Sequence, residues 1–140
     1  MLVFVFGTLK EGFPNFGTNA GIRVPGVFAT QHRYPFYLVG QRRSPWLINE
    51  PGHGEHVLGQ VFQVDPEALK RMDLLERVSE PDGYERIQIQ VTSQSDDPVG
   101  PVTVFAYLKR PRSLEKAEVV AGPLAEYTLE HAALYRPRAL

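Results

Sequence analysis

Leu2-Val3-Phe4-Val5-Phe6 is an unbroken apolar run that stops at Gly7 and continues as Thr8-Leu9-Lys10. Because polar residues do not alternate with the apolar ones, the run predicts a β-strand that is buried on both faces. The run is too short for the core of a signal peptide or for a membrane span, and no basic leader precedes it. We therefore expect a soluble, cytoplasmic protein built around this strand.

The composition limits the classes of protein to consider. The 140 residues predict one domain over residues 1–140, which are 43% hydrophobic and carry a net charge of -1. Such a balance lacks the clustered positive field that general binding to nucleic acids or membrane surfaces requires. The absence of cysteine excludes disulfide bonds, thiolate metal sites and cysteine nucleophiles. Twelve Gly and twelve Pro predict many turns and argue against a helical bundle.

Short apolar or alternating runs between turn residues predict the other strands. They cover residues 24–29, 33–39, 46–48, 56–64, 84–92 and 102–108, and a polar loop is expected over 93–101. Two helices are predicted, one over residues 66–78 with Asp65 as N-cap and Pro66 in the first turn, and one over residues 124–134. Strands and helices that do not alternate regularly predict an α+β fold around a twisted or closed sheet.

One acidic residue does not fit the pattern of the first predicted helix. Leu69 and Met72 belong to its apolar stripe, and Glu76 falls within that stripe at about 100° per residue. A carboxylate that faces the interior is costly unless it is paired or opens onto a cavity, and burial raises its pKa towards the range of a general acid/base. Two interpretations stay open: a functional carboxylate, or a helix-end glutamate that reaches solvent or pairs with Arg77, Arg86 or another arginine.

The other candidate motifs carry weaker signals. His53 and His56 lie in a Gly-rich turn with no third ligand at metal spacing, so we expect no metal site. The sequence has no phosphate-binding P-loop, no Gly-x-Gly-x-x-Gly motif and no serine in a nucleophile elbow. The basic cluster at residues 109–112, with Arg136 and Arg138, is expected to be solvated. The alternative is that this cluster forms an anion site, or the binding surface of a small RNA-binding barrel.

Several segments, taken in order, resemble the γ-glutamylcyclotransferase-like family, and within it the γ-glutamylamine cyclotransferases. The run at residues 3–15 is close to the family's opening strand and its Y-G-T-L-K-x-G-x-P-N loop. Pro45-Trp46-Leu47 and residues 57–65 form the second match. Residues 72–76, followed by Tyr84 and Arg86, are similar to the L-D-x-x-E…Y-x-R stretch, and residues 104–107 resemble a late strand. Each match alone is weak, whereas the ordered set is specific.

The resemblance implies a small mixed β-barrel with short flanking helices around a pocket. Members of the family release an amine from a γ-glutamyl compound by cyclising the glutamyl group to 5-oxoproline, and their catalytic acid/base falls on Glu76. The turn formed by Phe6, Gly7, Thr8 and Leu9 would bind the substrate's carboxylate or the developing oxyanion through backbone N–H groups. The implied partner is a small γ-glutamyl molecule, with no metal, nucleotide or redox cofactor, no nucleic acid and no membrane. The oligomeric state is not indicated.

One position departs from the family pattern. Phe6 stands where members usually have tyrosine, so any contact of that phenol is missing. Because the backbone N–H groups of the turn survive the change, we expect a small effect. Other substrates to consider are γ-glutamyl amino acids and a γ-glutamyl protecting group that is removed during biosynthesis. A non-catalytic small-molecule-binding module with the same barrel is the alternative from another class, and the presence of Glu76 argues against it.

Overall fold

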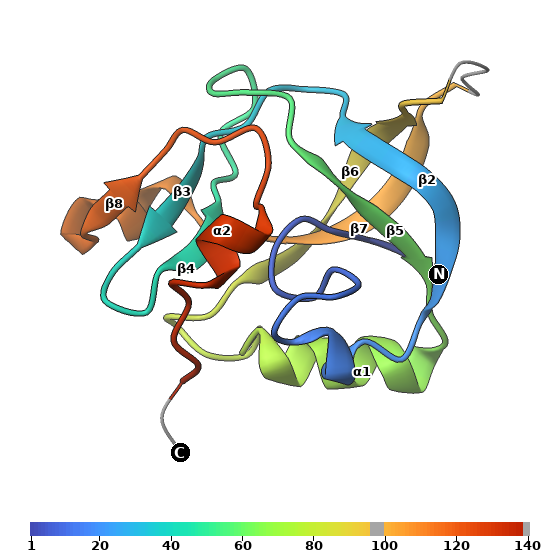
Figure 1. Ribbon diagram of the computed structural model, residues 1–140, viewed down its shortest axis with the longest axis horizontal. Helices are drawn as coiled ribbons and strands as arrows, with labels where there is room; N and C mark the ends of the chain where they lie inside the picture. The colour runs from blue at the N-terminus through green and yellow to red at the C-terminus, as the bar shows by residue number, and fades with distance from the viewer. Residues whose placement is uncertain (96–99, 139–140) are drawn as a thin grey trace.

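The computed structural model describes residues 1–95 and 100–138, and its main feature is a closed β-barrel (Figure 1). The strand order is β1-β5-β2-β6-β7. The strands are β1 (Leu2–Val5), β2 (Ile22–Thr30), β5 (Leu58–Gln63), β6 (Glu85–Ser93) and β7 (Val102–Leu108). Paired strands are antiparallel except β1 and β7, which close the barrel in parallel with Val3 opposite Phe105. The predicted mixed barrel is confirmed.

A smaller antiparallel sheet and short helices complete the fold. The sheet has the order β4-β3-β8 and lies at the left of Figure 1. Its strands are β3 (Phe36–Val39), β4 (Ser44–Leu47) and β8 (Val119–Ala121). The helices are α1 (Pro66–Leu75) and α2 (Leu129–Ala132), with the 3-10 turns η1 (Phe16–Thr18) and η2 (Pro111–Lys116). Among the residues described, no helix is long and apolar enough to cross a membrane.

Strand β1 is buried on both faces, as its unbroken apolar run predicts. Phe4 belongs to the core cluster shared by the barrel and the smaller sheet, together with residues such as Phe36 and Val61. Val3 and Val5 belong to a second cluster, which includes Met72 of α1. Successive side chains of a strand point to opposite faces, so one strand contributes to both clusters. The strand thereby connects the barrel to α1, which lies below it in Figure 1.

Helix α1 begins as predicted and ends earlier. The Asp65 side chain accepts a hydrogen bond from the N–H of Ala68 at 2.7 Å, and Pro66 occupies the first turn. The helix ends at Leu75 rather than at residue 78, because Arg77 has a left-handed backbone with φ of 55°. A residue in this conformation cannot continue a right-handed helix.

The prediction of a second helix over residues 124–134 is wrong for most of that range. Only α2 (Leu129–Ala132) is helical, and the segment before it forms hydrogen bonds with the rest of the fold. The N–H of Leu124 donates to the carbonyl of Phe36 at 2.8 Å, and the carbonyl of Ala125 accepts from the N–H of Leu58 at 2.8 Å. Tyr127 is fully buried. Because these partners are remote in sequence, the local pattern did not reveal them.

The remaining differences concern short strands and a loop. Strand β3 begins at Phe36, and Tyr34 before it forms an isolated bridge with Glu55 rather than part of the strand. The apolar triplet at 46–48 overlaps β4, which lies slightly earlier in the chain, and β8 was not predicted. Strand β6 includes Ser93, the first residue of the predicted polar loop, and residues 96–99 of that loop lie outside the described residues.

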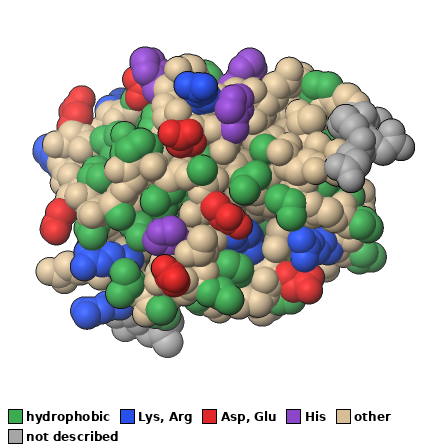
Figure 2. Space-filling view, turned by 45° about the horizontal axis from the view of Figure 1, so that its top comes forward, with side chains coloured by type: hydrophobic (Ala, Val, Ile, Leu, Met, Phe, Trp, Pro, Cys, Tyr) green, Lys and Arg blue, Asp and Glu red, His purple; other side chains and the backbone are tan. Residues whose placement is uncertain are grey.

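The charges of both signs are mixed on the surface in view. Figure 2 shows Lys and Arg side chains scattered among Asp and Glu side chains on that face, without a single basic field. This distribution agrees with the near balance of acidic and basic residues in the sequence.

Candidate active site

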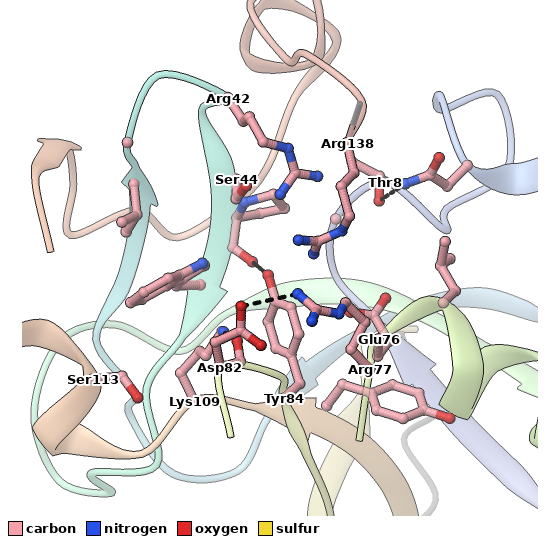
Figure 3. Close-up of a pocket in the computed structure, with 18 of the residues that line it drawn as sticks. Thr8, Arg42, Ser44, Glu76, Arg77, Asp82, Tyr84, Lys109, Ser113 and Arg138 are labelled. Carbon is pink, nitrogen blue, oxygen red and sulfur yellow. Dashed lines mark hydrogen bonds and ion pairs between the residues drawn. The ribbon is translucent and has the colours of Figure 1, made fainter. Parts of the chain in front are cut away.

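A cavity of about 990 Å³ opens where several segments remote in sequence meet (Figure 3). Its walls come from the turn after β1, the β3–β4 turn, the end of α1, the chain from β7 into η2, and the segment around residues 135–138. The volume lies at the upper end of the range for small-molecule sites, roughly 300–1,000 Å³. The five residues that the sequence singled out all line this cavity: Phe6, Gly7, Thr8, Leu9 and Glu76.

The end of α1 places Glu76 at the cavity. Glu76 is the C-cap of the helix, and its N–H donates to the carbonyl of Met72 at 2.9 Å. Arg77 follows in the left-handed conformation that glycine usually adopts at this position, and its N–H donates to the carbonyl of Leu74 at 3.2 Å. The carbonyl of Glu76 accepts from the N–H of Tyr84 at 3.0 Å. Both the N–H and the carbonyl of Glu76 are therefore held by backbone hydrogen bonds.

Burial changes the acidity of the Glu76 carboxyl. Loss of contact with water raises its pKa from 4.5 to about 7, although the positive charges of Lys109, Arg138 and Arg42 act in the opposite direction. The side chain keeps some exposure, because it borders the cavity. A carboxyl group with this pKa exchanges its proton near neutral pH, which suits a general acid/base.

Glu76 does not pair with either arginine that the sequence offered as a partner. Arg77 forms an ion pair with Asp82, with 2.9 Å between nitrogen and oxygen. Arg86 forms an ion pair with Asp73 at 2.6 Å. The interpretation of Glu76 as a helix-end residue paired with Arg77 or Arg86 is therefore wrong.

The pKa of Glu76 predicts how stability depends on pH. Because the folded-state pKa is raised, the folded protein binds the proton more tightly than the unfolded chain, and stability falls as pH rises from 4.5 to about 7. The shift corresponds to at most about 3 kcal/mol. Urea unfolding at pH 5 and pH 8 should show Glu76→Gln to be more stable than the wild-type protein at pH 8 and to lack this part of the pH dependence. Parallel pH profiles for the two proteins would contradict the raised pKa.

The turn after β1 is tightly constrained and leaves backbone donors unused. The N–H of Lys10 donates to the carbonyl of Gly7 at 3.1 Å, and the Asn15 side chain donates to the Thr8 hydroxyl at 2.8 Å. The Asn19 side chain donates to the carbonyl of Leu9 at 3.0 Å. Within residues 1–95 and 100–138, the N–H groups of residues 7–9 donate no hydrogen bond. Unused donors in a turn beside a cavity are suited to bind an anion.

Phe6 packs mainly against other aromatic rings. It is 7% exposed, and its ring meets the Phe36 ring edge-on with 5.3 Å between centroids. The centre of the Phe4 ring lies 6.2 Å from that of Phe6. The residue reaches the cavity wall without contributing a polar group. Phe6 therefore offers a substrate only apolar contact, whereas the turn that follows it offers backbone N–H groups.

A hydrogen-bonded cluster connects the end of α1 to the barrel. One oxygen of Asp73 accepts from the Tyr107 hydroxyl at 2.7 Å, and the other accepts from Arg86 at 2.6 Å. The guanidinium of Arg86 also lies 5.0 Å from the centre of the Phe105 ring. Burial, followed by the hydrogen bond to Asp73, raises the pKa of Tyr107 well above its usual range, so this hydroxyl remains a donor. The cluster positions the helix end that carries Glu76.

Lys109 belongs to the cavity rather than to a solvated basic cluster, so the expectation for this residue is wrong. It is 5% exposed, and its ammonium donates to the carbonyl of Asp82 at 2.5 Å. The ammonium also lies 4.4 Å from the centre of the Trp46 ring and 4.5 Å from that of Tyr84. Burial lowers the pKa of Lys109 to about 8, against the influence of Asp82 and Glu76. The one signal in the sequence was its place directly after an apolar strand.

The arrangement suits proton transfer next to bound anions. It combines a carboxyl group that titrates near neutral pH with unused backbone donors and several cations. In the described part of the chain, no group of three or more His, Asp or Glu side chains is arranged to hold a metal ion.

Sequence comparison connects this geometry to known proteins. A family model described as "Gamma-glutamyl cyclotransferase, AIG2-like" matches residues 3–129. The chain is 32% identical to the gamma-glutamylaminecyclotransferase of Homo sapiens, over 98% of this chain and 97% of that protein. It is 36% identical to the Bos taurus protein of the same name, over 75% of this chain. The match covers less than two thirds of several relatives: 63% of the bovine protein and 49% of gamma-glutamylaminecyclotransferase B of Danio rerio.

Structure comparison gives the same result. The crystal structure of an AIG2-like protein from Mus musculus superposes with a TM-score of 0.78 and 29% sequence identity. The superposition covers 98% of this chain and 95% of the mouse chain. The barrel and the smaller sheet thus belong to a fold that is already known in a relative.

Proposed function

The chain belongs to the AIG2-like gamma-glutamyl cyclotransferase family, and we propose that it releases an amine from a γ-glutamyl compound with formation of 5-oxoproline. The observation that carries this proposal is the Glu76 carboxyl. Burial raises its pKa to about 7, and Glu76 lines the same cavity as the turn at residues 7–9. We propose Glu76 as the general acid/base, and Phe6, Gly7, Thr8 and Leu9 as substrate-binding residues.

The reaction needs few protein groups because both reacting groups belong to the substrate. The α-amine attacks the γ-carbonyl carbon of the same glutamyl group, which closes a five-membered ring. The enzyme's first task is therefore to hold the folded conformation in which the nitrogen approaches the carbonyl. A cavity with a constrained turn on one side and the end of α1 on the other is suited to this task.

Glu76 would move the protons. An α-ammonium group is not nucleophilic, so the Glu76 carboxylate accepts a proton from it as the new C–N bond forms. The protonated carboxyl then donates a proton to the leaving nitrogen as the old C–N bond breaks. A second transfer of the same kind moves the other proton, so the α-nitrogen loses two protons and the leaving nitrogen gains two, and the products are 5-oxoproline and a protonated amine. These steps involve no metal, nucleotide or redox cofactor.

The turn at residues 7–9 would bind the negative charge of the substrate. Its N–H groups can donate to the glutamyl carboxylate or to the oxyanion that develops on the γ-carbonyl. Their positions are held by the hydrogen bonds of Asn15 and Asn19. Because these donors belong to the backbone, they do not depend on the side chain at position 6. We further propose that residues 1–140 act as one domain and that the protein works in the cytoplasm.

The direct test is 5-oxoproline release from γ-glutamyl-ε-lysine, γ-glutamyl-alanine and glutathione. Release from one of them identifies the class of leaving amine. We expect kcat/KM to rise with pH along a limb centred near pH 7, because Glu76 must lose its proton before it can accept one. A flat profile through this range would contradict the assigned role. No release from any compound by the folded protein would favour a non-catalytic binding module.

A further inference from the structure

Lys109 is fixed at the junction between the barrel and the smaller sheet. It follows the last residue of β7, and its N–H donates to the carbonyl of Leu47 in β4 at 2.8 Å. Its own carbonyl accepts from the N–H of Asn49 at 2.8 Å. The side chain therefore extends from a constrained backbone into the wall of the cavity.

The ammonium group of Lys109 is buried without a carboxylate partner. It donates to the backbone carbonyl of Asp82, and the rings of Trp46 and Tyr84 lie against it. In residues 1–95 and 100–138, it forms no ion pair with an acidic side chain. A lysine buried to this extent usually has a paired charge. Here the positive charge is left to act on the other groups around the cavity.

Tyr84 connects Lys109 to Glu76. Its ring centre lies 4.5 Å from the Lys109 ammonium, and its N–H donates to the carbonyl of Glu76 at 3.0 Å. Figure 3 shows these three residues in the lower part of the view, with Arg42 and Arg138 above them. Burial raises the pKa of Glu76 to about 7, and Lys109 is foremost among the cations that act against this rise, ahead of Arg138 and Arg42.

The three cations differ in their contact with water. Arg138 is exposed and Arg42 is half-buried, whereas Lys109 is buried. Water and dissolved ions screen exposed charges strongly and buried charges much less. Lys109 is therefore the cation whose charge reaches Glu76 with the least screening.

The other ionisable groups do not replace this charge. The groups around Glu76 and Lys109 come from several elements: Arg42 from the β3–β4 turn, Tyr107 from β7, Arg138 from the segment after α2, and Arg77, Asp82 and Tyr84 from the chain between α1 and β6. Arg77 and Asp82 form an ion pair with each other. Burial raises the pKa of both tyrosines above the usual range, so their hydroxyls stay neutral.

We infer that Lys109 is a positioning residue for the reaction, because its fixed positive charge keeps Glu76 ionised at neutral pH and so able to accept a proton from the substrate. This inference rests on the proposed role of Glu76. Burial by itself favours the neutral carboxyl, which cannot accept a proton. A buried cation offsets part of this effect. Lys109 thus acts through Glu76, and it transfers no proton itself.

Replacement of Lys109 by methionine tests the inference at Glu76 itself. Methionine keeps an apolar side chain between the two rings and removes the charge. Carboxyl ¹³C NMR follows the titration of Glu76, whose signal is identified by its absence in Glu76→Gln. We expect the midpoint to rise from about 7 in the wild-type protein by about one unit in Lys109→Met, because the loss of a nearby positive charge raises the pKa of a carboxyl group.

The same change should appear in the pH profile of the reaction. In Lys109→Met the limb of kcat/KM should move to higher pH by about one unit, so that kcat/KM is about tenfold below the wild-type value at pH 6 and close to it at pH 9. A structural disturbance of the cavity would instead lower kcat/KM at every pH. Recovery at alkaline pH therefore distinguishes the two effects.

Two further variants separate charge from structure. Lys109→Arg keeps a positive charge at this position and should leave the limb near pH 7. Arg77→Met is the matched control, because Arg77 lines the same cavity and also contacts Asp82, but its charge is paired with that carboxylate. Arg77→Met should leave the titration midpoint of Glu76 unchanged, even where the loss of the ion pair lowers activity.

A reciprocal measurement does not depend on whether Lys109→Met folds. Burial lowers the pKa of Lys109 to about 8, and the charges of Asp82 and Glu76 act against this fall. Coupling between two proton-binding sites is equal in both directions. Glu76→Gln should therefore lower the pKa of Lys109 by about one unit, which ¹³C NMR of the lysine Cε measures.

The outcomes separate this inference from the proposed function. An unchanged midpoint in either Lys109→Met or Glu76→Gln, or an equal loss of activity at every pH in Lys109→Met, would overturn the inference and leave the proposed function intact. A limb displaced as far in Lys109→Arg as in Lys109→Met would also overturn it, since the charge is kept. No release of 5-oxoproline by the folded wild-type protein would contradict the proposed function, and the inference would fail with it.

Discussion

Replacement of Glu76 by glutamine is expected to lower kcat for 5-oxoproline release by about 10²- to 10⁴-fold, the contribution of a general acid/base. Glutamine has nearly the same shape as glutamate, but it cannot accept the proton of the α-ammonium group. The hydrogen bonds at Glu76 that end the helix involve only its backbone, so they remain in the variant. Binding of the substrate should therefore be largely kept while turnover is lost.

Three measurements make this prediction specific. Calorimetric titration of the variant with a slowly turned-over substrate shows whether binding is retained. Unfolding at pH 8 shows whether the variant is folded, and it should be at least as stable as the wild-type protein because the buried charge is gone. Glu67→Gln is the control, since Glu67 is exposed in the first turn of the same helix. Unchanged turnover in Glu76→Gln would remove Glu76 from the mechanism.

Replacement of Gly7 by alanine should lower kcat/KM by about 10²-fold, which is the loss that a displacement of about 1 Å can cause. A Cβ atom at position 7 would lie 2.8 Å from Cγ of Pro45 and 3.2 Å from its Cβ. The Pro45 ring is stiff, and its carbonyl accepts from the Tyr84 hydroxyl at 2.9 Å, so β4 does not yield easily. The turn must then move away from β4, and its N–H groups move with it.

A second glycine provides the control for this substitution. Gly17 in η1 is exposed, and a Cβ atom there meets no other atom within 4 Å. Gly17→Ala should keep both activity and melting temperature close to those of the wild-type protein. The two variants should be compared by kcat/KM and by thermal unfolding. Full activity in a folded Gly7→Ala protein would show that the backbone of this turn does not bind the substrate.

Several features could be predicted from neighbouring residues because their causes are local. The apolar run at residues 2–6 forms a strand up to Val5 that is buried on both faces, and Asp65 caps α1 as its position suggested. Helical spacing also placed Glu76 within the apolar stripe of the first helix. The helix ends one residue before Glu76, but Glu76 keeps a right-handed backbone, with φ of -83° and ψ of -1°. The helical spacing therefore still applies to the direction of its side chain. The family resemblance then assigned to Glu76 a role that stays a prediction.

Other features could not be predicted because their partners are remote in the chain. The segment before α2 resembles a helix, but its backbone forms hydrogen bonds with Phe36 and Leu58 instead. The sequence predicted Lys109 as a member of a solvated cluster, but its ammonium group lies over the rings of Trp46 and Tyr84. Arg77 ends α1 in a conformation that its side chain does not favour, which no local pattern indicates.

Short stretches of sequence thus determined the two buried faces of β1, the start of α1 and the choice of Glu76 as the candidate carboxylate. Side-chain direction and helix capping depend on residues only a few positions apart. The cavity and the acidity of Glu76 were decided by the folded chain. The pKa of a carboxyl group depends on how much water it loses and on which charges surround it. For Glu76, the protein atoms that exclude water and the cations of Arg42, Lys109 and Arg138 are brought together only when the barrel, the smaller sheet and the segment after α2 have assembled.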